Sequence, residues 1–451
     1  MTTVATAPPA DTATAPEPAL LTRLREHFAA DPAQLPVVEQ TFQPYHRPNL
    51  HVAVQGLLAE PGRDPALVGV VVPQEFHNVT LAKLTRPRTA AEFDQGPVEY
   101  ADVDLAGDRR LACVKRGLYL FRDDGRPVAL LIGDMSVFRG GLTVEVMAGD
   151  RDTAERILRR IVRETRHGSA FRGSVLSVEQ DCTGNTKVQF HILPPVERAG
   201  VVLPDVVLQR IERHAVGLSR HAERLKAAGR HVKRGILLHG KPGTGKTLTA
   251  MYLAARMPGR TVLILTGAAI KAIETVCGLA RLLEPATVIL EDVDLIGTQR
   301  DGQDVGANAL LFELLNQMDG LGEDADILFV LTTNRPDVLE PALAARPGRI
   351  DLAVEVPLPD ADCRRRLFDL YARGLRLAVS DTDKLVARTA GVSGAFIREL
   401  LRKAAVLAAE EDGAGGELVV RDAHIEEGLA ELLVAGGPLT QTLLGATAAK
   451  A

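Results

Sequence analysis

Hydrophobic and polar positions follow different periods along the chain, and the first segment shows no period at all. Residues 1–19 are rich in Ala, Thr and Pro, a composition typical of disordered chain. A short helix is predicted over residues 20–30, where the apolar positions fall along one side. These positions are Leu20, Leu21, Leu24 and Phe28. We therefore expect a disordered tail and a short helix within residues 1–35.

The next segment, residues 36–198, mostly shows the pattern of β-strands. Apolar runs and alternation predict extended chain over 50–60, 68–74, 118–132, 142–148, 175–180 and 188–193. The third of these is predicted to be a hairpin that turns at Asp124-Gly125. One helix is predicted over residues 151–167, where apolar residues recur at helical spacing. With a boundary near Pro194-Pro195, the pattern predicts a separate α+β N-terminal domain that carries no chemical motif.

An apolar strand, a glycine-rich loop and a helix follow one another from residue 236. The loop reads GKPGTGKT over residues 240–247, which fits the pattern G-x-x-x-x-G-K-[ST]. Lys246 can reach the β- and γ-phosphates of a nucleotide, and the Thr247 hydroxyl can bind Mg²⁺. Three glycines let backbone N–H groups approach the phosphates without obstruction by a Cβ atom. They are Gly240, Gly243 and Gly245. The flanking strand and helix favour a phosphate-binding loop over a structural turn.

Two adjacent carboxylates end a second apolar run, TVILED, residues 287–292. In a fold with a phosphate-binding loop, a second strand brings a carboxylate toward the Mg²⁺ of the nucleotide. Glu291 would then lie on the metal side, acting through a Mg²⁺-bound water. Asp292 would orient or deprotonate the attacking water, a role that depends on positioning. The alternative is a strand end with two solvated acids.

A third apolar strand leads into a polar segment within residues 327–360. The strand ends at Asn334, whose amide can contact the γ-phosphate or the attacking water. Arg346 and Arg349 flank a Pro-Gly pair further along. Such arginines can stabilise transition-state charge on a nucleotide held by a neighbouring subunit. Taken alone, two arginines in a Pro-Gly loop are usually a surface feature.

Composition narrows the class of partner. The chain has 451 residues, too many for one ordinary domain, and its formal net charge of -5 gives no reason to expect nucleic acid. It has no Trp and no run of 18 apolar residues, and its N-terminus lacks the apolar core of a signal peptide. We therefore expect a cytoplasmic protein without a membrane span. The cysteines lack metal-ligand spacing, which favours reduced thiols; they are Cys113, Cys182, Cys277 and Cys363.

Arginines gather on the helix predicted over residues 151–167. They are Arg159, Arg160, Arg163 and Arg166. A solvated helix face is the expected interpretation, and an anionic docking patch is the alternative. By its position, the domain over residues 36–198 is interpreted as the part that meets a protein substrate or partner.

Together, the segments of the second half resemble the classical AAA family of ATPases. GKPGTGKT resembles the Walker A loop of that family, and VILEDVD resembles its Walker B strand. The segment from Thr332 to Asp360 resembles the second region of homology, and GVSGAFIRELLRKAA, residues 391–405, resembles the lid segment. The resemblance covers about residues 200–430.

The resemblance implies an α/β fold with a P-loop AAA module and a homohexameric ring. The nucleotide-binding subdomain, a parallel αβα sandwich, would span residues 199–357. A small helical lid would span 358–436 and a C-terminal tail 437–451. ATP and Mg²⁺ are the implied ligands, Asn334 the implied sensor, and Arg346 and Arg349 the implied arginine fingers. Further implied nucleotide contacts are Pro242, Thr244, Leu248, Gly394 and Ala395.

Three features depart from the family pattern. The Glu-Asp order in LEDVD resembles the mitochondrial AAA chaperones that assemble respiratory complex III, which have a membrane anchor that we do not expect here. The interval from Glu340 to Arg346 is one residue longer than usual. The segment between Gly267 and Thr287 has no aromatic residue for a pore loop, which leaves Lys271 and Ile273 as candidate pore contacts.

Two classes of function remain open. One is an ATP-hydrolysing ring that remodels or disassembles a protein or protein complex, which the complete set of site residues favours. The other is a nucleotide-gated scaffold or regulator with little threading activity, which the missing pore aromatic favours. The sequence has no HExxH motif of a membrane-type AAA protease, and its final residues, GATAAKA, do not resemble the tail of proteasome-activating ATPases.

Overall fold

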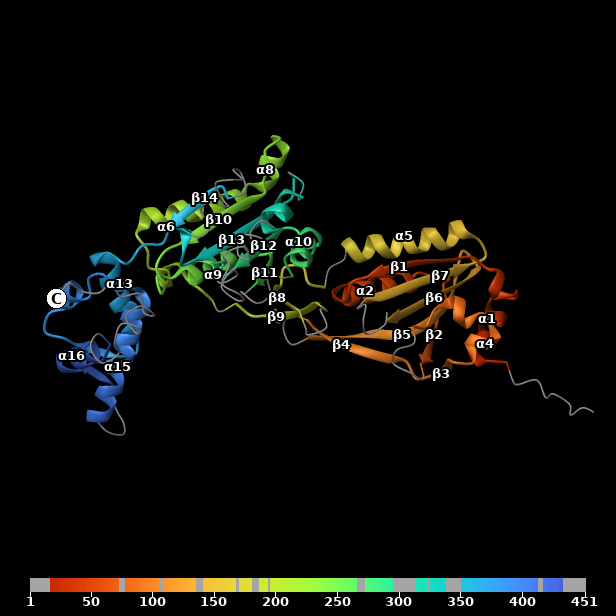
Figure 1. Cartoon of the computed structure of the whole chain (residues 1–451), viewed down its shortest axis with the longest axis horizontal. Coiled ribbons are helices and arrows are strands. Elements are labelled where there is room, and N and C mark those ends of the chain that lie inside the picture. The colour runs from red at the N-terminus through yellow and green to blue at the C-terminus, as the bar shows by residue number, and fades with distance from the viewer. Residues whose placement is uncertain are drawn as a thin grey trace, which may run out of the picture. The chain divides into compact units, whose positions relative to one another are not determined.

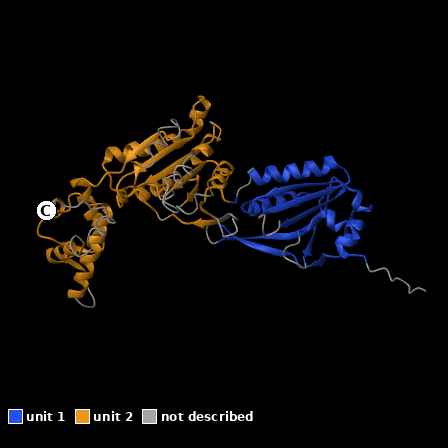
Figure 2. Cartoon of the chain, in the orientation of Figure 1, with its two compact units in different colours: residues 1–170, 182–185 blue, residues 171–181, 186–451 orange. Residues whose placement is uncertain are grey.

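The computed structural model describes most of the chain. The described residues are 17–72, 78–105, 109–134, 141–167, 170–180, 186–193, 195–265, 272–294, 313–320, 322, 324–337, 350–412 and 417–432. The chain divides into two compact units, shown in different colours in Figure 2. Unit 1 comprises residues 1–170 and 182–185, and unit 2 comprises residues 171–181 and 186–451. Every helix in the described ranges is too short or too polar to span a bilayer.

Unit 1 is built on an antiparallel sheet of order β1-β7-β6-β5-β2-β3, with β4 paired to β5 (Figure 1). The strands are β1 Val37–Phe42, β2 Ala66–Val71, β3 Asp94–Gly96, β4 Glu99–Leu105, β5 Arg109–Asp123, β6 Arg126–Asp134 and β7 Leu142–Ala148. The helices are α1 Ala19–Phe28, α2 Arg47–Leu58, α3 Leu81–Leu84, α4 Pro87–Ala90 and α5 Arg151–His167. Strand side chains alternate between faces, so Val144 and Val146 pack with α2 and α5, whereas Met147 packs with α1 and α3.

The hairpin predicted at Asp124-Gly125 is confirmed. Strands β5 and β6 pair in antiparallel register up to Asp123 and Arg126. Asp124 and Gly125 have φ values of 50° and 77°. Two central residues with positive φ give a turn whose twist matches that of the flanking strands, which is why Asp-Gly is favoured there.

The prediction of extended chain over residues 50–60 is wrong, because those residues lie mainly in helix α2. The buried apolar residues of α2 include Leu50, Ala53, Val54, Leu57 and Leu58. Their spacing of three and four residues is helical, and Pro48 at the second position fits a helix start. The apolar run over these residues has the period of a helix and not that of a strand.

Unit 2 contains a second sheet, of order β14-β10-β13-β12-β11-β8-β9. All neighbours in it are parallel except β8 and β9. Its strands are β8 Val175–Gln180, β9 Thr186–His191, β10 Arg234–His239, β11 Thr261–Leu265, β12 Ala286–Leu290, β13 Ile327–Thr333 and β14 Leu352–Glu355. Accompanying helices are α6 Asp205–Glu212, α7 Leu218–Arg220, α8 Ala222–Ala227, α9 Lys246–Ala255 and α10 Ile273–Leu282. The central strands are apolar throughout, as expected for a parallel sheet buried on both faces.

The remainder of unit 2 is a small, mainly helical subdomain with its own core. Its elements are α13 Ala361–Tyr371, β15 Arg376–Ala378, α14 Thr382–Arg388, α15 Gly394–Asp412, β16 Val419–Arg421 and α16 Asp422–Ala430. Phe368, Phe396 and Leu400 are fully buried in that core. The α/β fold with a helical lid, predicted from the family resemblance, is confirmed.

The boundary between the two units lies before the one expected near Pro194-Pro195, as the pairing of the strands shows. Strand β8 adds in parallel to β11, with Val175 opposite Val262 and Ser177 opposite Ile264. Strands β8 and β9, expected in the N-terminal domain, therefore belong to the sheet of unit 2. The division within the described chain falls between Ala170 and Phe171.

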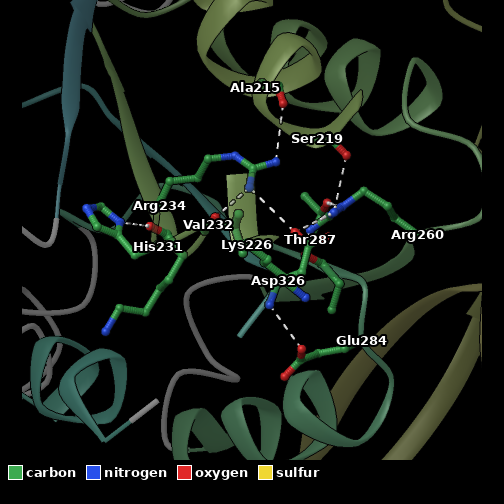
Figure 3. A network of polar contacts seen from close by, with 12 residues as sticks. Ala215, Ser219, Lys226, His231, Val232, Arg234, Arg260, Glu284, Thr287 and Asp326 are labelled. Atoms are coloured by element: carbon green, nitrogen blue, oxygen red, sulfur yellow. Dashed lines mark hydrogen bonds and ion pairs between the residues drawn. The ribbon is translucent and has the colours of Figure 1, made fainter. Parts of the chain in front are cut away.

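A buried network of charges ties together the amino ends of the unit 2 strands (Figure 3). Arg260 precedes β11 and pairs with Asp326, which precedes β13, at 2.8 Å. Arg234, at the start of β10, lies 3.5 Å from the same carboxylate and also donates to the Ala215 carbonyl. Burial lowers the pKa of Arg234 to about 10. Two buried guanidinium groups thus share one carboxylate, and backbone carbonyls accept from both of them. Arg234 Nε is buried without a hydrogen-bond partner among the described residues.

Candidate nucleotide-binding site

The glycine-rich loop lies between β10 and α9, at the carboxyl edge of the parallel sheet. Gly240, Gly243 and Gly245 have φ values of 149°, 73° and 98°, a region that L-residues with a Cβ avoid. A Cβ on Gly240 would overlap the carbonyl oxygen of Val356. The loop therefore needs glycine both for its backbone conformation and for its close approach to the chain after β14.

Lys246 begins α9 and folds back over the loop. Its Nζ donates to the carbonyl oxygens of Gly240 and Lys241, each at 2.9 Å. Burial lowers the pKa of the lysine, and the charges of Asp292 and Asp294 oppose that shift. The ammonium group is thus held at the loop by carbonyls that a phosphate oxygen can replace as its partner.

Glu291 follows β12 and lies beside Thr247. The carboxyl pKa of Glu291 is raised, first by burial and then by the charge of Asp292, whereas a hydrogen bond with the Thr247 side chain lowers it. One carboxyl oxygen, Oε1, is buried without a hydrogen-bond partner in the described part of the chain. A hydroxyl and an unsatisfied carboxylate oxygen are ligands that Mg²⁺ or its bound waters prefer. The residues present therefore fit a Mg²⁺ ion next to the loop.

Asp292, the residue after Glu291, has a strained backbone conformation, with a φ of 48°. Its N–H donates to the Thr332 hydroxyl at 3.0 Å, and its Oδ1 accepts from the Asn334 amide at 3.2 Å. The end of β13 thus holds Asp292 through both backbone and side chain. Of the acids and the amide singled out in the sequence, the structure brings Asp292 and Asn334 into direct contact.

Asp294 is a structural member of this site that the sequence analysis did not single out. Its Oδ1 accepts from the Thr333 hydroxyl at 2.8 Å and from the Asn334 N–H at 3.1 Å. Thr332 and Thr333 are fully buried. Two threonines at the end of an otherwise apolar strand, opposite three acids, were the signal in the sequence. Asp294 fixes the backbone that carries Asn334.

The lid segment contacts the glycine-rich loop directly. The N–H of Ala395 donates to the carbonyl of Gly243 at 3.1 Å. A Cβ on Gly243 would lie 2.7 Å from the Ser393 hydroxyl and 2.8 Å from the Ala395 Cβ. Gly394 begins α15, so this helix approaches the loop by its amino end. The absence of a side chain on Gly243 is what allows the lid to lie this close.

A cavity of about 580 Å³ lies between the loop, the strand ends and the lid. Of the residues singled out in the sequence, it is lined by Pro242, Gly243, Gly245, Lys246, Thr247, Leu248, Asp292, Asn334 and Ala395. A narrow neighbouring cavity of about 40 Å³ is lined by Thr244 and Gly394, among others. Glu291 is not among the residues that line the larger cavity, but its carboxyl group forms a hydrogen bond with the Thr247 side chain.

Four lining residues were missed by the sequence analysis. They are Val196, Met251, Tyr371 and Arg398. Val196 lies between β9 and β10, Met251 is on α9, and Tyr371 and Arg398 come from lid helices α13 and α15. Val196, Met251 and Tyr371 supply apolar and aromatic surface that suits a flat heterocyclic base next to the phosphate loop. No local motif marks these positions, because their proximity depends on how the lid folds back.

Several predicted positions lie outside the described residues or away from the site. Arg346, Arg349 and Lys271 lie outside the described residues. Ile273, a candidate pore contact, is 2% exposed, and that interpretation is wrong, because the side chain packs in the interior. The described cysteines are buried free thiols, namely Cys113, Cys277 and Cys363. Among the described residues, no group of three or more His, Cys, Asp or Glu could hold a metal ion.

Comparison with known families agrees with this geometry. Residues 236–358 match the AAA family, described as the ATPase family associated with various cellular activities. This segment is an AAA ATPase domain, for which ATP is the nucleotide and Mg²⁺ the cofactor. The match begins within β10 and extends past β14, so it includes the loop, both acids and Asn334.

The curated relatives share the same half of the chain. ATP-dependent zinc metalloprotease FtsH 3 of Synechocystis sp. is 35% identical over 240 residues, which is 50% of this chain and 37% of the relative. ATP-dependent zinc metalloprotease FtsH of Mycobacterium tuberculosis (strain H37Rv) is 33% identical over 233 residues, or 49% of this chain and 30% of the relative. The chain thus spans about a third of the length of the curated relatives it matches.

Proposed function

We propose that the chain is an ATP-hydrolysing AAA ring ATPase that remodels or disassembles a protein or protein complex recognised through its N-terminal domain. One observation carries the proposal: Lys246, Thr247, Asp292 and Asn334 line one cavity that the lid closes. Phosphoryl transfer depends mainly on positioning and electrostatic stabilisation, and this cavity supplies a cation, a carboxylate and an amide around one point.

Each residue at the site has a proposed part in ATP hydrolysis. The loop N–H groups and the Lys246 ammonium bind the phosphates. Thr247 and Glu291 would hold Mg²⁺, with Glu291 acting through water, and the ion would supply neutralisation of phosphate charge. Asp292 accepts a hydrogen bond from the attacking water and receives its proton, while the Asn334 amide fixes the direction of that carboxylate. The inverted order Glu-Asp thereby works as a variant Walker B motif, like that of the mitochondrial complex III assembly chaperones.

Assembly and location belong to the same proposal. We infer a homohexamer in which Arg346 and Arg349 reach the nucleotide of a neighbouring subunit, and a cytoplasmic protein with no nucleic acid partner. The relatives are named as zinc metalloproteases, and the HExxH motif of membrane-type AAA proteases does not occur in this chain. Remodelling without proteolysis is therefore the activity that we propose for these 451 residues.

The second candidate function is a nucleotide-gated scaffold with little threading activity. It is favoured by the segment between β11 and α10, which carries no aromatic residue that could grip a polypeptide. In that case ATP binding would control assembly, and turnover would be slow and independent of a substrate.

Steady-state ATP hydrolysis by the full chain with Mg²⁺ tests the proposal. Wild type is expected to release phosphate. Lys246→Ala is expected to lose both nucleotide binding and turnover, because Lys246 is the cationic residue that the glycine-rich loop contributes to the cavity lining. Lys241→Ala, on the exposed side of the same loop, is the matched control and should keep nucleotide binding. An Asp292→Asn protein charged with ATP should retain its protein partner for identification. Unchanged ATP binding by Lys246→Ala would refute the assignment of the loop.

A further inference from the structure

A groove in unit 1 lies outside the nucleotide site and is formed by strand β1 and helix α5. Its volume is about 690 Å³. The strand contributes Val37 to Gln40, and the helix contributes residues from Arg151 to Arg166. Figure 1 shows α5 running alongside β1. The groove therefore combines a strand edge on one side with a helix face on the other.

Strand β1 is the first strand of its sheet. It pairs with β7 on one side, in antiparallel register from Val37–Met147 to Phe42–Leu142. In the described chain no strand pairs with its other side. Val37 is 36% exposed, and Glu39, Gln40 and Thr41 are exposed as well. An edge strand of this kind offers free N–H and C=O groups to an additional strand.

The helix side of the groove is cationic. Four arginines and two glutamates line the groove, which leaves an excess of two positive charges. Arg151 and Arg159 share the single carboxylate of Glu155. Arg163 pairs with the adjacent Glu164 at 3.2 Å. Arg166 is exposed and has no carboxylate within ion-pair distance among the described residues. The arginines are thus only partly neutralised by the protein itself.

Apolar surface lies between the strand and these arginines. Leu158 and Val162 occupy the helix side of the groove, and Val38 packs beside them on the strand side. A binding segment would meet hydrogen-bonding groups along β1, an apolar floor and a row of arginines. In an extended chain, alternate side chains point to the same face, so one face can carry acids toward α5.

We propose that this groove binds an extended acidic polypeptide segment, which adds as a strand to the free edge of β1. The inference rests on the proposed function, because it assigns the chemistry of the partner that the N-terminal unit recognises. The main-chain hydrogen bonds to β1 fix the register of the segment. The arginines of α5 select for Asp and Glu, and Glu39 on the strand disfavours a segment with acids on both faces. The arginine cluster is then a docking patch, rather than the solvated face expected from the sequence.

Binding of defined peptides to the full chain tests the proposal by fluorescence anisotropy. The probe is a labelled peptide that alternates Glu and Val, and the comparison peptides carry Lys for Glu or N-methyl groups that remove main-chain donors. We expect the Glu-Val peptide to bind and added salt to weaken its binding. Neither the peptide with Lys for Glu nor the N-methylated peptide should bind. Equal binding of the N-methylated peptide would overturn strand addition, and no binding of the Glu-Val peptide would overturn the proposal.

Protein variants locate the binding. Arg163→Glu combined with Arg166→Glu should weaken the peptide about tenfold or more, because two attractive contacts become repulsive. The matched control, Arg86→Glu with Arg88→Glu, makes the same charge change on exposed residues of unit 1 outside the groove and should bind as wild type. Equal losses in both variants would overturn the site, as would tighter binding of single-stranded DNA than of the peptide.

ATP hydrolysis, measured in parallel, separates this proposal from the proposed function. The variant Arg163→Glu with Arg166→Glu should keep the basal rate of wild type, which also shows that it is folded. Peptide binding by a wild-type chain that hydrolyses no ATP would refute the ATPase proposal and leave the groove assigned. An active ATPase that binds no acidic peptide would refute the groove alone.

Discussion

At the scale of single residues, the adjacent acids Glu291 and Asp292 differ in their surroundings. Glu291 lies half-buried beside Thr247, whereas Asp292 accepts a hydrogen bond from Asn334 and lines the cavity. The swap of Glu and Asp shifts each carboxylate by one methylene, and the backbone of Asp292, with its positive φ, is where the chain adjusts. The same chemical groups can therefore serve in the opposite order.

The first prediction concerns these two acids. Asp292→Asn should keep ATP binding but lower turnover roughly 100-fold or more, because general bases contribute on that order. Glu291→Gln should instead raise the Mg²⁺ concentration needed for half-maximal activity. Both are read from steady-state rates over a Mg²⁺ titration, with nucleotide binding measured separately. A full loss in Glu291→Gln with no loss in Asp292→Asn would reverse the proposed roles.

The second prediction concerns Glu145, a buried acid on β7 of unit 1. Its Oε2 accepts from the Leu81 N–H at 2.7 Å, and its Oε1 is buried without a partner among the residues that the structure describes. Burial raises the carboxyl pKa from 4.5 to about 7; Glu39 adds to the shift, and the Leu81 hydrogen bond and Lys83 oppose it. Because the folded pKa lies above the unfolded value, the stability contribution is full below pH 4.5 and is lost as pH rises through 7.

Glu145→Gln should therefore stabilise unit 1 at high pH and have little effect at low pH. The glutamine keeps the acceptor for Leu81 but carries no charge. The difference in free energy of unfolding between variant and wild type should grow from pH 4.5 to 7 and reach on the order of 3 kcal/mol. Denaturant unfolding across this range measures it. If the difference in free energy of unfolding does not change with pH, ionisation of Glu145 does not destabilise the folded protein.

At the scale of secondary-structure elements, the contact between the lid helix α15 and the glycine-rich loop is decisive. Ala395 donates to Gly243, and Ser393 fills the space where a Cβ on Gly243 would lie. Both the loop and the lid contribute to one cavity wall, so a change in their contact alters the site even where no phosphate contact is touched.

The third prediction follows from that contact. Gly243→Ala should weaken ATP binding by about tenfold, since a Cβ at positive φ costs roughly 1–2 kcal/mol and also pushes against the lid. Gly374→Ala, in the lid, has a similar φ of 86° and open space around it, so it is the matched control. Isothermal titration of nucleotide into both proteins gives the comparison. Equal affinities would show that the lid contact does not support binding.

At the scale of the whole molecule, the proposed ring requires residues from two subunits at one site. Arg349 lies outside the described residues, and its assignment rests on the sequence. A finger that acts between subunits separates the catalytic acid and the arginine into different chains, which makes complementation possible.

The fourth prediction uses this separation. Arg349→Ala and Asp292→Asn proteins should each hydrolyse ATP slowly, with losses of at least about tenfold and up to the 10³–10⁵ typical of arginine fingers. Mixed rings should recover activity, because some interfaces pair an intact Asp292 with an intact Arg349. Phosphate release by the mixture, compared with each protein alone, measures this. A mixture no faster than its components would place the arginine in the same subunit as the acid.

The glycine-rich loop, the two acids and Asn334 could be predicted from the sequence, because a local pattern marks each of them. The conformational freedom of glycine and the position of polar residues at the end of apolar runs depend on the local sequence and not on distant segments. The parallel arrangement then brings strand ends to one edge. Tyr371, Arg398 and Val196 are not local in this sense, and only the folding of the lid over the loop put them at the cavity.

The pairing of strands could not be predicted from local patterns and is known from the folded structure. The extended pattern over residues 175–180 predicted strand β8 correctly, but a pattern of this kind does not identify the partner of a strand. Strand β8 pairs with β11 and therefore belongs to the sheet of unit 2. Likewise, the arginines of α5 were visible in the sequence, whereas the free edge of β1 beside them was not. Periodicity reports how a segment is buried, and pairing between distant segments depends on the whole chain.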